Sequence, residues 1–143
     1  MISGELSGQA DWTRLPLTGT EPPSTVNSCY DMNRGVLVTR VGYASLDRGT
    51  WEWNGAAWTQ IEPLSGTGFG PMAFDPMRGR VILIEDPGFD NPGFPAVPQR
   101  LWEWNGRTWT MVWDFRSATI GPSPRYGFVA AFDPNHGEIL LFG

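Results

Sequence analysis

The sequence predicts an all-β fold built from a repeated four-stranded sheet. The pentapeptide Trp-Glu-Trp-Asn-Gly occurs at residues 51–55 and again at 102–106, and Trp-Thr follows each copy three residues later. A repeat period of about 50 residues is typical of architectures that stack one supersecondary unit several times. No stretch shows sustained helical periodicity, and the 18 glycines and 13 prolines interrupt every candidate helix.

A tight turn precedes a short apolar run at three places in the chain. The turns start at Asp31, Asp75 and Asp133, and each ends four residues later in glycine. An Asp side chain accepts hydrogen bonds from its own turn, and Gly tolerates a positive φ, so the pattern predicts a hairpin turn. The apolar runs are too short for helices and predict buried strands. They occupy residues 36–38, 81–84 and 139–142.

The Trp-Glu-Trp segment predicts a third strand, and Asn-Gly predicts the hairpin turn that ends it. The Trp-Thr segment beyond this turn supplies a fourth strand. One repeat therefore contains, in chain order, a strand before the Asp turn, the apolar run, Trp-Glu-Trp and Trp-Thr. Such a sheet cannot bury both of its faces alone, so we expect the repeats to stack as the blades of a β-propeller.

This pattern resembles the bacterial form of the kelch repeat. That repeat also places an Arg-containing turn and an apolar strand before a Trp-x-Trp-Asn/Asp-Gly hairpin and a downstream Trp. The resemblance covers nearly the whole chain and implies a propeller of four-stranded, kelch-like blades. The sequence differs from the family after the second strand, where Gly-Gly is usual and this chain has Gly42-Tyr43 and Asp86-Pro87.

We expect residues 1–143 to form a single kelch-like propeller unit of about three blade-equivalents. Two blades are predicted whole, at residues 24–63 and 68–115. The third is predicted to be split between the ends of the sequence. Residues 125–143 supply its first two strands, and residues 1–16 supply its last two.

The first residues match the missing half of a blade. Asp11-Trp12-Thr13 resembles the Trp-Thr strand, and Gly4–Gly8 is a degenerate copy of Trp-Glu-Trp-Asn-Gly. Propellers usually carry about 4 to 8 blades, so three cannot close a ring. We therefore expect two chains to complete a six-bladed ring as a homodimer, in which each chain supplies strands to the split blade of the other. The alternative is that the sequence is a fragment of a longer propeller.

Composition limits the classes of partner. The net charge of −5 argues against nucleic acid, because its phosphate backbone repels an acidic protein. No apolar run reaches the roughly 18 residues of a membrane-spanning helix, so no membrane partner is expected. The first residues lack a charged and apolar signal segment, which favours a cytoplasmic location. Cys29 is the only cysteine, so no intrachain disulfide is expected.

The function that this fold predicts is non-catalytic binding of a protein or a small polar ligand, through the long loops or the central channel. The short turns are expected at one end of each blade, and the longer, more variable loops at the other. The predicted binding residues lie in or beside these loops: Phe89, Asp90, Phe94, Phe115, Arg116, Arg125 and Tyr126. Aromatic side chains on stiff loops offer contact area to a ligand. The alternative for Phe89 and Phe94 is burial beneath their own loop.

Two other functions stay open on the sequence alone: a structural element that self-assembles, and a hydrolase acting on carbohydrate. The acidic residues that a hydrolase would use are Glu85, Asp86 and Asp90. We expect no cofactor and no metal, because one histidine and one cysteine cannot build the copper site of galactose-oxidase-like propellers, and no metal-ligand spacing occurs. His136 aligns with Met77 and Asn33 of the other turns, which argues against a catalytic role, and no catalytic residue is assigned.

Overall fold

The structure, a computed structural model, describes residues 19–23, 25–41, 49–62, 68, 70–85, 100–115, 117, 120–122 and 127–143. Within these residues it contains ten β-strands and no helix, so the all-β prediction is confirmed. The strands form three antiparallel sheets. Across the same residues, no helix is present that is long and apolar enough to cross a membrane.

The first two sheets have four strands each, paired in chain order, and the third has two. The first sheet comprises β1 (Thr25–Asp31), β2 (Val36–Val41), β3 (Thr50–Trp53) and β4 (Trp58–Glu62). The second comprises β5 (Met72–Asp75), β6 (Arg80–Ile84), β7 (Arg100–Trp104) and β8 (Trp109–Asp114). The third comprises β9 (Val129–Asp133) and β10 (Glu138–Phe142). The strands predicted within residues 1–16 lie outside the described residues.

The tight turns form where the sequence predicts them, and an Asp side chain holds each one together. Asp31 Oδ1 accepts hydrogen bonds from the backbone N–H groups of Asn33 and Arg34, both at 3.1 Å. Gly35 then closes the β1–β2 turn at a φ of 68°, a conformation that other residues adopt only with strain. Asp75 repeats these contacts in the β5–β6 turn, at 2.9 and 3.0 Å. The turn chemistry read from the sequence therefore fixes the hairpins.

The strand register is the same in the two four-stranded sheets. Trp53 pairs with Leu37 between β3 and β2, and Trp104 pairs with Val81 between β7 and β6. Both sheets also shift register at the same position between their third and fourth strands. Each residue of the first sheet therefore has a structural counterpart in the second.

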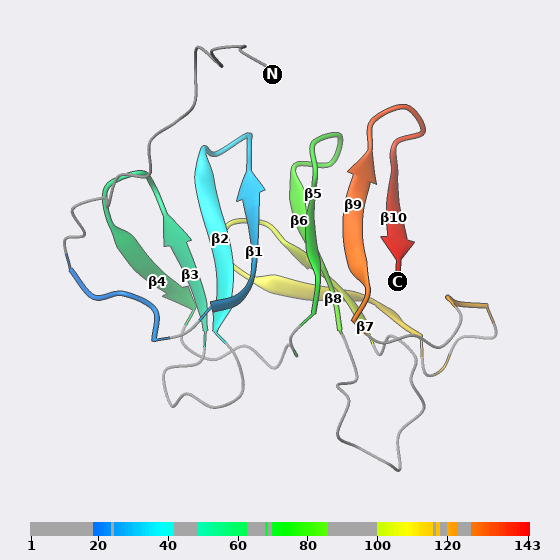
Figure 1. The fold of residues 1–143 in the computed structure, drawn as a ribbon, viewed down its shortest axis with the longest axis horizontal. Coiled ribbons are helices and arrows are strands. Elements are labelled where there is room, and N and C mark those ends of the chain that lie inside the picture. Colours follow the sequence, from blue (N-terminus) through cyan, green and yellow to red (C-terminus); the bar gives the residue numbers. More distant parts are fainter. Residues whose placement is uncertain are drawn as a thin grey trace, which may run out of the picture.

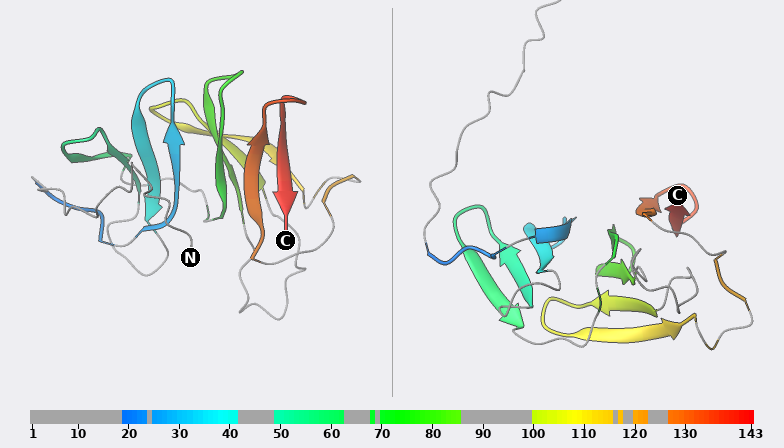
Figure 2. Two further views of the ribbon diagram at one scale, coloured as in Figure 1. Left: turned by 45° about the horizontal axis from the view of Figure 1, so that its top comes forward. Right: turned by 60° about the horizontal axis from the view of Figure 1, so that its bottom comes forward.

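The three sheets stand side by side in chain order, and the hairpins β1–β2, β5–β6 and β9–β10 have their turns at the same end (Figure 1). Strand β1 contacts β5, and β5 contacts β9, so the first strands of the sheets form an inner row. Strands β3–β4 and β7–β8 extend away from this row (Figure 2). Neighbouring turns also touch in the same way, because Gly79 lies against Asn33 and Gly137 lies against Met77. The third sheet therefore packs beside the second sheet in the same way as the second sheet packs beside the first.

Two apolar cores fill the spaces between the sheets. The core between the first and second sheets consists of Val38, Met72, Phe74, Val81, Leu83 and Trp104. The core between the second and third sheets consists of Ile82, Ile84 and Phe128, with Leu101, Phe115, Ala130, Ile139 and Leu141 packed against it. Tryptophans of β7 and β8 extend the first core outward. The third sheet contributes only two strands, β9 and β10, to the second core. This core therefore extends less far outward along the sheets than the first core does.

Candidate functional site

An arginine joins the Asp turn to the Trp-Glu-Trp strand in the first sheet. Arg34 Nε lies 2.7 Å from Asp31 Oδ2, and Arg34 Nη1 lies 2.7 Å from Glu52 Oε1. Burial alone would lower the pKa of the Arg34 guanidinium, but the hydrogen bonds to Asp31 and Glu52 outweigh this effect and raise the pKa. The guanidinium therefore stays charged and holds the carboxylate of Glu52 in place.

The second sheet repeats this arrangement. Arg78 Nε lies 2.7 Å from Asp75 Oδ2, and Arg78 Nη1 pairs with the carboxylate of Glu103. Burial acts to raise the pKa of the Asp75 carboxyl, but the hydrogen bonds from Arg78 and Met77 and the charge of Arg78 outweigh it, so the pKa falls below its ordinary value of 3.8. An Asp–Arg–Glu triad is thus a repeated structural unit of the four-stranded sheets.

The carboxylate of Glu52 also binds the neighbouring sheet. Trp104 is fully buried and donates its indole N–H to Glu52 Oε1 at 2.9 Å. Beside it, Trp109 donates its indole N–H to Thr50 Oγ1 at 2.7 Å. We call the face of a sheet that meets the next sheet along the chain its trailing face, and the opposite one its leading face. The trailing face of the first sheet accepts hydrogen bonds, and the leading face of the second sheet donates them.

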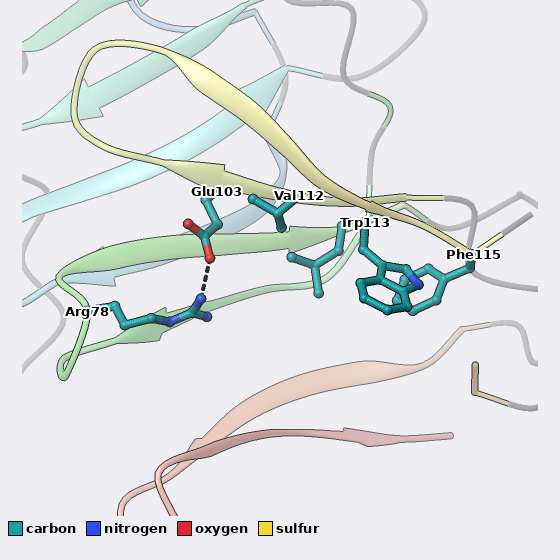
Figure 3. Close-up of a pocket in the computed structure, with 6 residues that line it drawn as sticks. Arg78, Glu103, Val112, Trp113 and Phe115 are labelled. Atoms are coloured by element: carbon teal, nitrogen blue, oxygen red, sulfur yellow. Dashed lines mark hydrogen bonds and ion pairs between the residues drawn. The ribbon is translucent and has the colours of Figure 1, made fainter. Parts of the chain in front are cut away.

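The trailing face of the second sheet lines an open pocket. The shared register makes Glu103 the counterpart of Glu52, and Leu101 the counterpart of Thr50. The pocket has a volume of about 500 Å³ and is lined by Arg78, Leu101, Glu103, Val112, Trp113 and Phe115. In Figure 3, the labelled side chains project from the second sheet on the side of β9 and β10. We refer to this feature below as the β7–β8 pocket.

The described part of the third sheet covers the β7–β8 pocket only in part. Strands β9 and β10 pack on the inner strands of the second sheet, and Leu101 and Phe115 border this contact. Farther from the inner row, on β8, Val112 and Trp113 remain 43% and 52% exposed. In the first sheet, the counterpart of Val112 is Ile61, which packs against the first core. The pocket therefore lies where a third and fourth strand of the next sheet would pack.

Apolar residues at equivalent positions are buried in the middle of the row of sheets and exposed at its ends. On the leading faces, Phe74 is 6% exposed, whereas its counterpart Tyr30 in the first sheet is 54% exposed. On the trailing faces, Val38 and Ile82 are 0% and 1% exposed, whereas their counterpart Leu140 in the third sheet is 50% exposed. Both ends of the described row thus present surfaces that bind another sheet elsewhere in the same molecule.

The structure corrects the alignment of His136. The β9–β10 turn has the same register as the other two turns, which places His136 with Arg34 and Arg78 instead of with Met77 and Asn33. The sequence alignment was displaced by one residue. His136 Nδ1 lies 2.6 Å from Asp133 Oδ2, and this hydrogen bond is the main cause that lowers the pKa of Asp133. His136 is therefore the third-sheet equivalent of the triad arginine.

One of the seven predicted binding residues belongs to the β7–β8 pocket. Phe115 is half-buried, and its ring lies 6.5 Å from that of Trp113, centroid to centroid. The other six predicted residues lie outside the described residues: Phe89, Asp90, Phe94, Arg116, Arg125 and Tyr126. The sequence prediction missed Trp113, although one signal was available. Trp113 stands where the first repeat has Glu62, so this tryptophan is not part of the repeated pattern.

The acidic residues proposed for a hydrolase are in part engaged in structure. Glu85 is buried, accepts the Gly68 backbone N–H at 2.7 Å, and lies 3.5 Å from Arg100 Nη1. Asp86 and Asp90 lie outside the described residues. Among the residues that are described, no group of three or more His, Cys, Asp or Glu side chains is arranged to hold a metal ion.

The single cysteine packs against the first core. Burial and, to a smaller extent, the charge of Asp31 raise the pKa of the Cys29 thiol to about 11. Because the thiolate is the nucleophilic form, this shift disfavours reaction of Cys29 near neutral pH.

Comparison of the chain with protein-family models, curated proteins and solved structures finds no match.

Proposed function

We propose that this protein is a non-catalytic interaction module made of kelch-like propeller blades, and that it acts by binding further sheets at its open faces. One observation carries the proposal: positions that are buried between sheets in the middle of the row are exposed at both ends. Tyr30 at the leading end and Leu140 at the trailing end are each about half exposed, at 54% and 50%. At the trailing end Val129 and Phe142 pair across β9 and β10 and are also exposed, at 58% and 81%, and an exposed apolar surface of this kind marks an interaction site.

The partner that this proposal favours is a second copy of the chain, in a six-bladed ring. Within the described residues, β10 pairs only with β9, so its outer edge is open to another strand. An exposed strand edge is a template for pairing with another chain, and β10 carries Phe142 at 81% exposure. In the proposed dimer, residues 1–16 of each copy complete the sheet that β9 and β10 of the other copy begin.

A ligand site on the long loops belongs to the same proposal. A scaffold of rigid sheets with variable loops would bind a protein or a small polar ligand through the predicted aromatic and charged loop residues. Phe115 at the rim of the β7–β8 pocket supports this reading, because it places an aromatic ring where the pocket borders the loop after β8.

Light scattering during size-exclusion chromatography tests the proposal. We expect a mass of twice 15.9 kDa at micromolar concentrations. The variant Leu140→Glu places a charge on the open trailing face and should shift the protein toward monomer. Ile120→Glu is the matched control, because Ile120 is 83% exposed and belongs to neither apolar core. A wild-type protein that remains monomeric at about 100 μM would rule out the homodimer.

A further inference from the structure

The first sheet shows in detail what its trailing face binds. The occupant is the β7–β8 hairpin, whose two indoles donate hydrogen bonds to Glu52 and Thr50. The Asn-Gly turn of this hairpin rests on the triad arginine, because a Cβ at Gly106 would lie 2.8 Å from Arg34 Nη1. The β7–β8 pocket presents the equivalent surface, with Glu103 in the position of Glu52.

The chemistry of the β7–β8 pocket selects a large apolar group. Its walls are the apolar side chains Leu101, Val112, Trp113 and Phe115. At one end stands the carboxylate of Glu103, which is 17% exposed and paired with Arg78. An indole ring offers such an apolar body, and two indoles cover the equivalent surface of the first sheet.

Residues 1–16 contain a segment with the pattern of the occupant. In the alignment with Trp-Glu-Trp-Asn-Gly, Leu6 takes the position of Trp104, and Gly8 takes that of Gly106. Trp12 corresponds to Trp109 with one additional residue in the turn, because it lies four residues after Gly8 and Trp109 lies three after Gly106, and it is the only tryptophan among residues 1–16. The pocket is more apolar at the facing position, since Leu101 replaces the hydroxyl of Thr50. Trp12, which faces this position, would therefore meet an apolar wall.

The opposite face of the same segment matches the first sheet of its own chain. Ser3 and Glu5 stand two residues apart, as the hydroxyl and carboxylate acceptors of β3 do. The leading face of the first sheet carries Trp53 and Trp58, whose ring centroids lie 5.6 Å apart. The tryptophan pair that binds β3 has the same arrangement, at 5.3 Å. A segment with the acceptors Ser3 and Glu5 on one face and the large side chains of Leu6 and Trp12 on the other fits between two sheets.

We propose that the β7–β8 pocket binds residues 1–16 of a second copy, with Trp12 as the anchor and its ring packed against Leu101. This inference rests on the homodimer proposed above and names the contact that holds it together. In this arrangement Ser3 and Glu5 face the tryptophans of their own first sheet, while Leu6 and Trp12 face the pocket of the partner. Each dimer contains two such contacts, related by its two-fold axis.

A disulfide between the segment and the pocket tests the contact. Two single-cysteine chains are made in a Cys29→Ser background, one with Trp12→Cys and one with Val112→Cys, and are mixed under mild oxidation. We expect a covalent dimer whose linkage mass spectrometry locates between positions 12 and 112. The matched control replaces Val112→Cys by Ile120→Cys, which is exposed outside the pocket. Crosslinking at position 112 that does not exceed that at position 120 would overturn the proposal.

A second outcome would show that the occupant of the pocket is not a second copy. A chain that carries both cysteines and forms the disulfide within one monomer would show that residues 1–16 bind the pocket of their own chain. Light scattering of the unmodified protein is run in parallel. A dimer that gives no crosslink at position 112 retains the proposed function but rejects this contact, whereas a monomer rejects both.

Affinity measurements test the anchor without relying on crosslinking. Sedimentation equilibrium should show a dimer Kd about 100-fold higher for Trp12→Ala, which removes the whole ring. Trp12→Phe keeps a smaller aromatic ring against the apolar wall and should raise the Kd only about tenfold. Near-ultraviolet circular dichroism verifies that each variant folds. A Kd unchanged in Trp12→Ala would contradict the assignment of Trp12 as the anchor.

Discussion

At the scale of single residues, the distinctive feature is a carboxylate that serves two sheets. Glu52 accepts a charged hydrogen bond from Arg34 in its own sheet and an indole N–H from Trp104 in the next. Burying a carboxylate is costly unless its oxygens are paired. The turn arginine satisfies that condition, so that Glu52 can bind the neighbouring sheet.

Removing the donor on the other side of this contact should weaken the stacking of the sheets. Trp104→Phe keeps an aromatic ring in the core but leaves Glu52 without the indole N–H. We expect the free energy of unfolding to fall by about 2–4 kcal/mol, since a hydrogen bond to a charged group and part of a buried ring are lost. Urea denaturation followed by circular dichroism measures the change. Ile120→Ala is the control, because Ile120 is 83% exposed and belongs to neither apolar core, so its replacement should change stability by less than about 1 kcal/mol.

The turn carboxylates should make stability depend on acid pH. The pKa of Asp75 is lower in the folded protein than its ordinary value of 3.8, so its ionised form stabilises the fold above that pH. This contribution is lost as the pH falls below 3.8 through the folded pKa. Urea titrations at several pH values between about 2 and 5 should show a shallower pH dependence for Asp75→Asn than for the wild type. Equal slopes would show that Asp75 is not coupled to Arg78.

At the scale of elements, the Asn-Gly hairpin turn has two roles. It reverses the chain in both copies, and in the second copy it also contacts the preceding sheet. Gly55 and Gly106 both have positive φ, at 96° and 92°, as their turns require. Only the second one touches the preceding sheet. A Cβ at Gly106 would lie 2.8 Å from Arg34 Nη1, whereas nothing lies within 4 Å of the equivalent position at Gly55.

This difference provides a matched pair of variants. Gly55→Ala should cost about 1–2 kcal/mol of stability from backbone strain alone. Gly106→Ala should cost measurably more, because Arg34 is held by Asp31 and Glu52 and cannot move away without losing an ion pair. Thermal or urea unfolding of the two variants measures the difference. Equal losses would mean that the hairpin turn does not pack against Arg34.

At the scale of the whole molecule, each sheet is stabilised by the neighbouring sheets that pack on its two faces. The second sheet is covered on both faces of its inner strands, and Phe74 and Ile82 there are 6% and 1% exposed. The first and third sheets each have one face without a described neighbour, which exposes Tyr30 and Leu140. This dependence on neighbours is expected of stacked repeats, in which stability is a sum of terms between adjacent units.

The proposed dimer should therefore couple folding to protein concentration. A ligand or subunit that binds only the folded state shifts the unfolding equilibrium by mass action. We expect the thermal midpoint to rise over a hundredfold range of concentration, and the rise to be smaller for Leu140→Glu. Differential scanning fluorimetry measures both. A midpoint independent of concentration in the wild type would indicate unfolding of a monomer.

The sequence by itself determined the local structure. Three Asp turns with a terminal glycine and two Trp-Glu-Trp-Asn-Gly segments predicted the hairpins, because turn conformation depends on the φ preferences and side-chain hydrogen bonds of adjacent residues. Strand boundaries were predicted less accurately than the turns, since β2 extends to Val41, beyond the predicted run at 36–38. His136 was misaligned by one residue, although it follows Asp133 at the spacing at which Arg34 follows Asp31, and the register of β9 and β10 confirms that position.

Only the tertiary structure decided which faces meet. Glu52 and Trp104 lie far apart in the chain, and neither turn chemistry nor strand alternation indicates that their side chains touch. The β7–β8 pocket likewise depends on how far the third sheet reaches across the second. Such contacts follow from the packing of whole sheets, which is a sum of many weak apolar contributions and carries no local sequence signal.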